Sequence, residues 1–196
     1  ADVLEKDPAN RLFARGPRVR LPAESVRDNA LAIAGLLSDA MYGPSVMPPQ
    51  PDGIWTSTYN DSVWETSDGS DRYGRGQYTF HKRTSPYPSM LTFDAPTREW
   101  CTIRRIQSNT PLQALVTLND PVYVEAAQAF ARRILTEGGA TDADRARFAF
   151  RTALAREPKP AELDAVLGLY QRRAAFYAEQ HGEAQRMATD PLGSPP

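Results

Sequence analysis

Apolar residues recur at a helical spacing near the start of the chain. They fall at steps of three and four residues, as on one face of an α-helix: Val26, Ala30, Ile33, Ala34 and Leu37. Pro22 comes just before them, and Glu24 lies in the first turn, where an acidic side chain interacts favourably with the helix dipole. We therefore predict an amphipathic helix over residues 21–40. Leu31 and Leu36 fall away from its main apolar stripe, so we expect both to be exposed.

Two further helix starts follow each other between residues 109 and 121. The sequences Asn109-Thr110-Pro111 and Asn119-Asp120-Pro121 each end in a proline. Asn, Thr and Asp side chains accept hydrogen bonds from the free N–H groups of a first helical turn, and a proline at the first position gives up an N–H that had no partner. The pattern predicts helices over residues 111–118 and 121–136. An apolar face places the second of them near the centre of the core: Tyr123, Ala126, Ala127, Phe130 and Ile134.

Two more helical patterns come next, one that begins near residue 142 and ends before Arg156-Glu157-Pro158, and one over residues 160–180. Thr141 or Asp142 caps the first of these helices, and a proline opens the second. Beyond the last helix we expect a flexible tail over residues 183–196.

Residues 41–110 interrupt this helical order. The part from 41 to 96 holds seven of the 17 prolines and five of the 12 glycines, and no helical period is sustained there. Its many large aromatic side chains are unlike a disordered linker, so we expect them to pin an ordered segment against the helices. Alternation in residues 77–84 indicates a strand that residues 90–93 could pair with, which allows at most one small β-hairpin. The predicted fold is mainly α, with five or six helices wrapped by this segment in a single domain over residues 1–182.

The overall charge excludes some partners. The 196 residues include 23 basic and 24 acidic side chains, and the net charge of -1 gives no whole-chain field to hold nucleic acid or an anionic membrane. No apolar run approaches the length that spans a bilayer. Cys101 is the only cysteine, so the sequence offers no internal disulfide, no Cys-based zinc cluster and no haem attachment motif. We expect the chain itself to bind neither haem nor structural zinc.

The aromatic-rich segment is the best candidate for a ligand site. Flat rings interleaved with polar side chains stack on a sugar face and hydrogen-bond its hydroxyl groups. The candidate ligand-binding residues are Trp55, Tyr59, Trp64, Tyr73, Tyr78, His81 and Arg83. A glycan site requires at least two of the five tryptophan and tyrosine rings in this set to be partly exposed, roughly coplanar and lined along one groove. The alternative is that the rings form the core of the segment itself.

Two other groupings have weaker chemical signatures. Acidic residues around Gly69 could gather about Ca²⁺, although their spacing does not fit an EF-hand, and solvated turn residues are the alternative: Asp61, Glu65, Asp68 and Asp71. Cys101 with His81 would be the minimum for a thiolate nucleophile. The alternative for Cys101 is a small buried apolar residue.

Charged and polar residues near the central helices predict a structural network. Arginine suits such a network because its planar fork bonds two acceptors at once. The predicted members are Asp94, Glu99, Arg104, Arg105 and Asp120, together with the helix-capping Asn109 and Asn119. We expect this network to fix how the irregular segment docks on the helices, with a set of exposed salt bridges as the alternative.

Several stretches of the chain resemble successive blocks of a known family. They are NRLFARGPRVRLPAESVRDNALAIAGLLS, GPSVMPPQPDGIW, YTFHKRTSPYPSMLTFDAPTRE, CTIRRIQSNTPLQALVTLNDPVYVEAA and FRTALAREPKPAEL. Together they resemble the C-terminal part of the planctomycete-type secreted domain of unknown function 1553 family, over about residues 10–178. The resemblance implies an extracytoplasmic location, either periplasmic or secreted. It also implies linked cytochrome-c-like modules that carry any haem, and a chain that is an excerpt of a longer protein.

Two functions are open from the sequence. The first is a non-catalytic accessory or interaction module that positions other domains of the full-length protein, including cytochrome-c-like modules, with polysaccharide as a further partner. In that case Leu31, Leu36, Leu169 and Phe176 mark docking sites for neighbouring segments. The second is a catalytic domain acting on a glycan or ester, or an oxidoreductase subunit coupled to a haem domain. No nucleophile, base and orienting group can be placed together from motifs, but an enzyme that uses dispersed carboxylates leaves no short motif.

Overall fold

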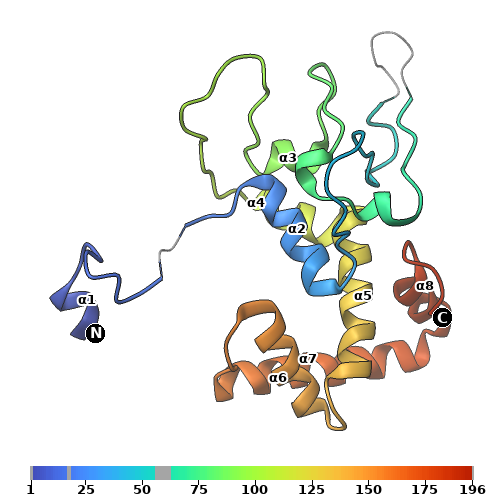
Figure 1. The fold of residues 1–196 in the computed structure, drawn as a ribbon. Coiled ribbons are helices and arrows are strands. Elements are labelled where there is room, and N and C mark those ends of the chain that lie inside the picture. The colour runs from blue at the N-terminus through green and yellow to red at the C-terminus, as the bar shows by residue number, and fades with distance from the viewer. Residues whose placement is uncertain (1, 17–18, 56–62, 196) are drawn as a thin grey trace.

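The computed structural model describes residues 2–16, 19–55 and 63–195 of the chain. These residues form eight α-helices and two 3₁₀ helices with no strand, so the predicted mainly α fold is confirmed, with more helices than expected (Figure 1). The α-helices are α1 (Asp2–Lys6), α2 (Ala23–Ala34), α3 (Pro88–Thr92), α4 (Pro111–Asn119), α5 (Pro121–Glu137), α6 (Asp142–Leu154), α7 (Pro160–Glu179) and α8 (His181–Thr189). The 3₁₀ helices are η1 (Gly69–Tyr73) and η2 (Gly76–Tyr78).

The helix starts obey the predicted capping chemistry. Helices α4 and α5 begin at Pro111 and Pro121. The Asp120 carboxylate accepts the Val122 N–H at 3.0 Å and so caps α5. At α6 the Thr141 hydroxyl oxygen accepts the backbone N–H of Asp144 at 3.1 Å. Local chemistry therefore sets where the C-terminal helices begin.

The first long helix is shorter than predicted. Helix α2 stops at Ala34 because Gly35 takes the left-handed conformation, with φ of 77°, and its N–H donates to the Ala32 carbonyl at 3.1 Å. The predicted exposure of Leu31 is wrong: this side chain is only 1% exposed and packs in the core. Leu36 is half-buried against the same cluster.

The predicted hairpin is replaced by other structure. Pro88 opens helix α3 over most of the second predicted strand, and residues 76–78 form η2. A single parallel bridge between Val46 and Thr79 is the β-type pairing found in the described part of the chain. A proline at the first helical position costs no hydrogen bond, which favours the helix over a strand at this point.

Part of the predicted flexible tail is helical. Helix α8 begins at His181, and the Gln128 side chain of α5 anchors the end of α8 and the residues after it. Its Nε2 donates to the Met187 and Asp190 carbonyls at 2.7 Å each, and its Oε1 accepts the Leu192 N–H at 3.1 Å. One buried amide on α5 therefore satisfies three backbone groups of this segment.

Helix α5 is the central element, with α2 and α6 packed against it (Figure 1). Two clusters of buried side chains form the core. The first contains Ala23, Tyr87, Met90, Phe93 and Tyr123. The second contains Leu31, Ala34, Val122, Ala126 and Ala129. The central position predicted for residues 121–136 is confirmed by the buried Tyr123 and Ala126, although Ala127 of the predicted face is exposed and Val122, outside that face, is buried.

Buried charges dock the irregular segment on the helices. Arg27 of α2 is 1% exposed and donates to the Gly74 carbonyl at 2.6 Å and the Arg72 carbonyl at 3.2 Å. From α5, the Glu125 carboxylate accepts the Tyr73 hydroxyl at 3.0 Å and the Arg72 Nε–H at 3.1 Å. A chain without regular secondary structure must satisfy its backbone groups through such side-chain contacts.

Close backbone contact completes this docking. The Gly76 N–H donates to Asp28 at 2.7 Å, and a Cβ at position 76 would lie only 2.9 Å from the Glu24 carbonyl oxygen. Glycine is therefore required sterically where η2 crosses α2.

Candidate functional site

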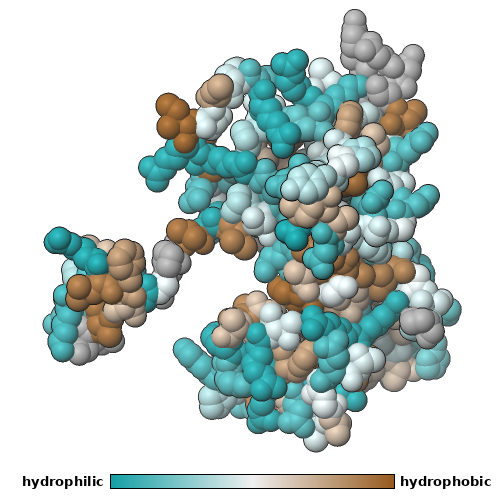
Figure 2. Space-filling view, viewed as in Figure 1, coloured by the Kyte–Doolittle hydropathy of each residue, from teal (hydrophilic) through white to brown (hydrophobic). Residues whose placement is uncertain are grey.

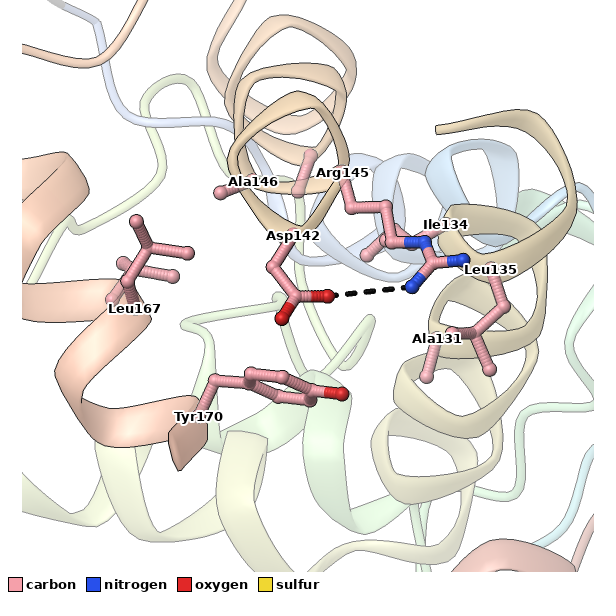
Figure 3. A pocket seen from close by; sticks show the side chains of 10 residues that line it. Ala131, Ile134, Leu135, Asp142, Arg145, Ala146, Leu167 and Tyr170 are labelled. Carbon is pink, nitrogen blue, oxygen red and sulfur yellow. Dashed lines mark hydrogen bonds and ion pairs between the residues drawn. The ribbon is translucent and has the colours of Figure 1, made fainter. Parts of the chain in front are cut away.

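An apolar hollow lies where helices α5, α6 and α7 meet (Figure 3). Its volume is about 290 Å³. Ten residues line it: Ala131, Ile134, Leu135, Asp142, Arg145, Ala146, Ala149, Val166, Leu167 and Tyr170. Figure 3 shows Leu167 and Tyr170 of α7 facing Ala131 and Leu135 of α5 across this space. This hollow is the strongest candidate for a binding site among the described residues because it is concave and almost entirely apolar.

Two features of the sequence create the hollow. Gly138 and Gly139 turn the chain sharply between α5 and α6, with Gly139 at a φ of 93°, where a side chain would be strained. A Cβ at Gly138 would lie 3.0 Å from the Arg145 Cα, so glycine also lets α6 pack closely here. Ala131, Ala146 and Ala149 then contribute only methyl groups to the walls and leave the space unfilled.

One ion pair borders the apolar space. Arg145 Nη1 lies 3.3 Å from Asp142 Oδ1, and the two side chains are 30% and 50% exposed. The Nε of Arg145 is buried and has no hydrogen-bond partner among the described residues. The edge of the hollow thus carries both signs of charge, while its interior offers mainly apolar contacts to a ligand.

The aromatic candidates form a cluster rather than a flat platform. Trp55 and Trp64 meet edge to face, with ring centroids 5.2 Å apart and planes at 62°, so the coplanar arrangement expected of a glycan site is wrong for this pair. Trp64 stacks on the buried Tyr87 at 5.7 Å, and its Nε1 donates to the Pro48 carbonyl at 2.9 Å. Trp55 stands near Phe80 at 6.2 Å, and the Lys82 ammonium lies 5.0 Å from the centre of its ring. Trp64 thus packs against the first buried cluster and belongs to the core, whereas the ring contacts of Trp55 are with side chains of the irregular segment.

The two tryptophans nevertheless border a shallow hollow of about 260 Å³. Polar side chains share its lining, among them Gln50, Asp52 and Thr66. Gln50 Oε1 and Trp55 Nε1 are buried and have no hydrogen-bond partners in the part of the chain that the structure describes. Indole rings beside such polar groups are typical of carbohydrate sites.

The other predicted ligand residues are dispersed. The hydroxyl of Tyr73 bonds Glu125, while the hydroxyl oxygen of Tyr78 accepts the Tyr42 N–H at 2.9 Å. The ring nitrogen Nε2 of His81 lies 3.1 Å from the Thr97 carbonyl oxygen, and Arg83 is exposed. Tyr59 lies outside the described residues.

The acidic residues around Gly69 form no assembled metal site among the described residues. Within residues 2–16, 19–55 and 63–195, no group of three or more His, Cys, Asp or Glu side chains is placed to hold a metal ion, and Asp61 lies outside those ranges. Cys101 is exposed, so the alternative of a buried small apolar residue is wrong.

The predicted polar network is divided among separate contacts. Asp94 bonds Ser108, while Arg105 forms a two-pronged ion pair with Glu24 at 2.6 and 3.1 Å. Asp120 caps α5. The remaining predicted members lie apart from these contacts: Arg104, Glu99 and Asn109 are exposed, and Asn119 Nδ2 donates to the Leu115 carbonyl of its own helix at 2.8 Å.

Burial perturbs the titratable groups beneath α5. Loss of solvent raises the pKa of Asp120, although the Val122 N–H and the charge of Arg27 act in the opposite direction. Burial likewise raises the pKa of Tyr87 and Tyr123 well above the ordinary tyrosine value. The sequence does not reveal Arg27 and Glu125 as buried, because a single charge on a helix gives no sign of burial; only the neighbouring apolar positions of α2 and α5 indicate the faces that turn inward.

Comparisons with known proteins place the chain in a family. The chain matches no curated protein and no solved structure. None of the helices in the described ranges combines the length and the apolar character needed to cross a membrane. The family PSD1, described as "Protein of unknown function (DUF1553)", matches residues 1–170, which ends at Tyr170 in the apolar hollow. Because this match covers most of the 196 residues and confirms the resemblance found in the sequence, the chain belongs to the DUF1553 family.

Proposed function

We propose that this chain is a non-catalytic interaction module of a secreted multidomain, cytochrome-linked protein, and that the α5–α6–α7 hollow receives a helix of a neighbouring domain. The hollow carries the proposal. A closed apolar cavity of about 150 Å³ holds one benzene molecule. The volume of about 290 Å³ therefore gives room for two large apolar side chains of a partner.

The surface beside the hollow supports the same role. Three residues of its lining are themselves exposed: Leu135 of α5 at 58%, and Val166 and Tyr170 of α7 at 38% and 49%. Clustered apolar side chains of this size are typical of protein interfaces. The Asp142–Arg145 pair at the edge supplies polar groups for the rim of such an interface. The favoured partner is a helix that presents leucine- or phenylalanine-sized side chains with polar residues around them.

Filling the hollow tests this function. Ala131 lines it, so Ala131→Trp places an indole in the space, whereas Ala165 on α7 is exposed and absent from the lining. Each variant is titrated with the remaining domains of the full-length protein, expressed separately, and binding is measured by calorimetry. We expect Ala131→Trp to weaken binding at least tenfold and Ala165→Trp to leave it unchanged. Equal affinities for the two variants would refute the role of the hollow.

The Trp55–Trp64 hollow favours a second function, the binding of carbohydrate. Its lining combines indole rings with the side chains of Gln50, Asp52 and Thr66. A sugar ring seated on Trp55 would approach the face not covered by Lys82. The test is Trp55→Ala, which should abolish binding of oligosaccharides while the melting temperature changes little. If Trp55→Ala is strongly destabilised and the native chain binds no sugar, the two rings have a structural role alone.

A further inference from the structure

A loop of the chain projects from the body between α3 and α4. It covers residues 96–107, and Figure 1 shows it extending away from the helices. Its base is closed by Asp94, whose carboxylate accepts the Ser108 N–H at 2.7 Å and the Ser108 hydroxyl at 2.7 Å. Gln113 braces the same point, donating to the Thr92 carbonyl at 2.8 Å and to Ser108 Oγ at 3.2 Å. Because its ends are held together, we call it the Ω-loop, although its side chains lie open to solvent; surface loops of this kind are frequently functional.

The tip of this Ω-loop is apolar and fully in solvent. Trp100 is 73% exposed, and Ile103 reaches 104%, as much as in an isolated peptide; Ile106, nearer the base beside Asp94, is 80% exposed. In Figure 2 brown side chains stand out on this projection beside teal ones. Isolated apolar side chains are ordinary on a protein surface, but three large ones on a single projecting loop mark an interaction site.

The same loop carries local positive charge. Residues 96–107 contain one acidic residue, Glu99, and three arginines, Arg98, Arg104 and Arg105. The whole chain, by contrast, has a net charge of -1. Arg105 is paired with Glu24, while Arg98 and Arg104 are exposed. Arg98 and Arg105 also line an open hollow of about 420 Å³ beside Trp100 and Cys101. Glu99 shares this lining, and both Nη atoms of Arg105 already donate to Glu24, so the guanidinium of Arg98 is the group that an entering anion would meet there.

The shape of the loop decides between kinds of partner. A protein partner must supply a cavity complementary to a convex projection, whereas the surface of a lipid bilayer adapts to any projecting shape. Tryptophan concentrates at membrane–water interfaces, isoleucine enters the acyl region, and basic side chains are attracted to anionic headgroups. The three residue types occur together here, on a part of the chain that extends away from its neighbours.

We propose that the Ω-loop of residues 96–107 docks this protein on an anionic membrane surface, with Trp100 and Ile103 entering the interface and Arg98 and Arg104 contacting lipid phosphate. This is peripheral attachment, and it is independent of the proposed domain-docking role of the α5–α6–α7 hollow. Salt screens charges that are far from the membrane, so the arginines of the loop decide the attraction to anionic lipid. The nearly neutral net charge of the whole chain contributes little.

The test is sedimentation with lipid vesicles at low salt. The native chain should bind phosphatidylcholine vesicles that contain phosphatidylglycerol, should not bind pure phosphatidylcholine, and should lose binding at high salt. Brominated lipid should quench the fluorescence of the native chain but not that of Trp100→Ser. The double variants Trp100→Ser/Ile103→Ser and Arg98→Gln/Arg104→Gln should each weaken binding at least tenfold. Leu118→Ser, which replaces a 72% exposed leucine outside the loop, is the matched control and should bind as the native chain does.

Each contrary outcome overturns the proposal. Circular dichroism establishes first that all variants keep the native helix content. Failure of the native chain to bind anionic vesicles, or equal binding by the loop variants and Leu118→Ser, excludes membrane docking by this loop. Binding of inorganic phosphate alone, without vesicle binding, assigns the Arg98–Arg105 hollow to a free anion instead. If the native chain binds a protein that the loop variants do not bind, and the native chain does not bind vesicles, the loop is assigned to a protein partner.

Discussion

Asp94 accepts hydrogen bonds from the backbone N–H and the hydroxyl of Ser108, which joins two residues 14 positions apart in the sequence. The backbone N–H of Ser108 and then its hydroxyl hold the pKa of Asp94 below the ordinary value, because both favour the charged carboxylate. A depressed pKa in the folded state contributes stability that is present above the unfolded pKa of about 3.9 and lost as the pH falls through the folded pKa. The base of the loop is therefore acid-sensitive.

Nuclear magnetic resonance can monitor this contact directly. The Ser108 amide should shift with pH, with its midpoint below about 3.9, and the shift should vanish in Asp94→Asn. At neutral pH Asp94→Ala should cost about 1 kcal/mol of unfolding free energy and speed trypsin cleavage after Arg98 and Arg104. An amide that titrates at the ordinary aspartate pKa would show that the contact does not stabilise the charged form.

Arg27 should be among the residues most sensitive to substitution. Arg27→Met removes the donors of the Arg72 and Gly74 carbonyls and leaves the buried Asp120 without its nearby positive charge. We expect a loss of about 3–5 kcal/mol in unfolding free energy, the range for breaking a buried charge contact. Urea unfolding of Arg27→Met and Arg151→Met measures the difference. Arg151 is 60% exposed with one ion pair to Glu157 at 3.5 Å, so its replacement should cost no more than about 0.5 kcal/mol; equal losses would contradict the docking role of Arg27.

Two tyrosines should resist alkaline titration. Burial raises the pKa of Tyr87 and Tyr123, so both should stay protonated until the fold opens. A raised pKa in the folded state means that stability is fully present below the unfolded tyrosine pKa of about 10 and decreases as the pH rises above it. Ultraviolet titration of the native chain should show a late ionisation step, and Tyr87→Phe should make this step smaller. A decrease of the early ionisation step at about pH 10 instead would place this hydroxyl in solvent.

Trp64 should tolerate loss of its N–H better than loss of its ring. Trp64→Phe keeps an aromatic side chain against Tyr87 but removes the hydrogen bond to Pro48, at a cost of about 1 kcal/mol. Trp64→Ala also empties the space in the aromatic cluster and should cost about 3–5 kcal/mol. Thermal unfolding compares the two variants. Little destabilisation by Trp64→Ala would mean that the ring belongs to a ligand site and not to the core of the segment.

The helical half of the fold could be predicted because its signals are local. Thr141, Asp120 and the two prolines at 111 and 121 fix helix starts through contacts within one turn, and the structure confirms each of them. The irregular segment lacks such signals. Its shape depends on contacts such as Arg27 with Gly74, separated by 47 residues, which no short pattern reveals. The helix at Pro88–Thr92 escapes sequence analysis because its apolar and β-branched residues also suit a strand.

The candidate sites show the same limit. The apolar hollow depends on three alanines that come together only when α5, α6 and α7 pack, so composition and spacing give no indication of it. The aromatic residues are evident from composition, but their use in the core depends on the 62° angle between Trp55 and Trp64. Helical spacing alone predicts that Leu169 and Phe176 are exposed, and they are. Leu31 breaks the same rule because α5 covers a wider face of α2 than the apolar stripe suggests.

The contact between Tyr73 and Glu125 also has a consequence for how the protein is made. Glu125 comes 52 residues after Tyr73, a length that takes roughly 3–10 s to synthesise at about 5–20 residues per second. During this interval the aromatic rings of the irregular segment leave the ribosome before the helix that will anchor them. Exposed aromatic surface of this kind binds chaperones and promotes aggregation. Production of the protein therefore depends on whether its nascent chain is shielded until α5 has emerged.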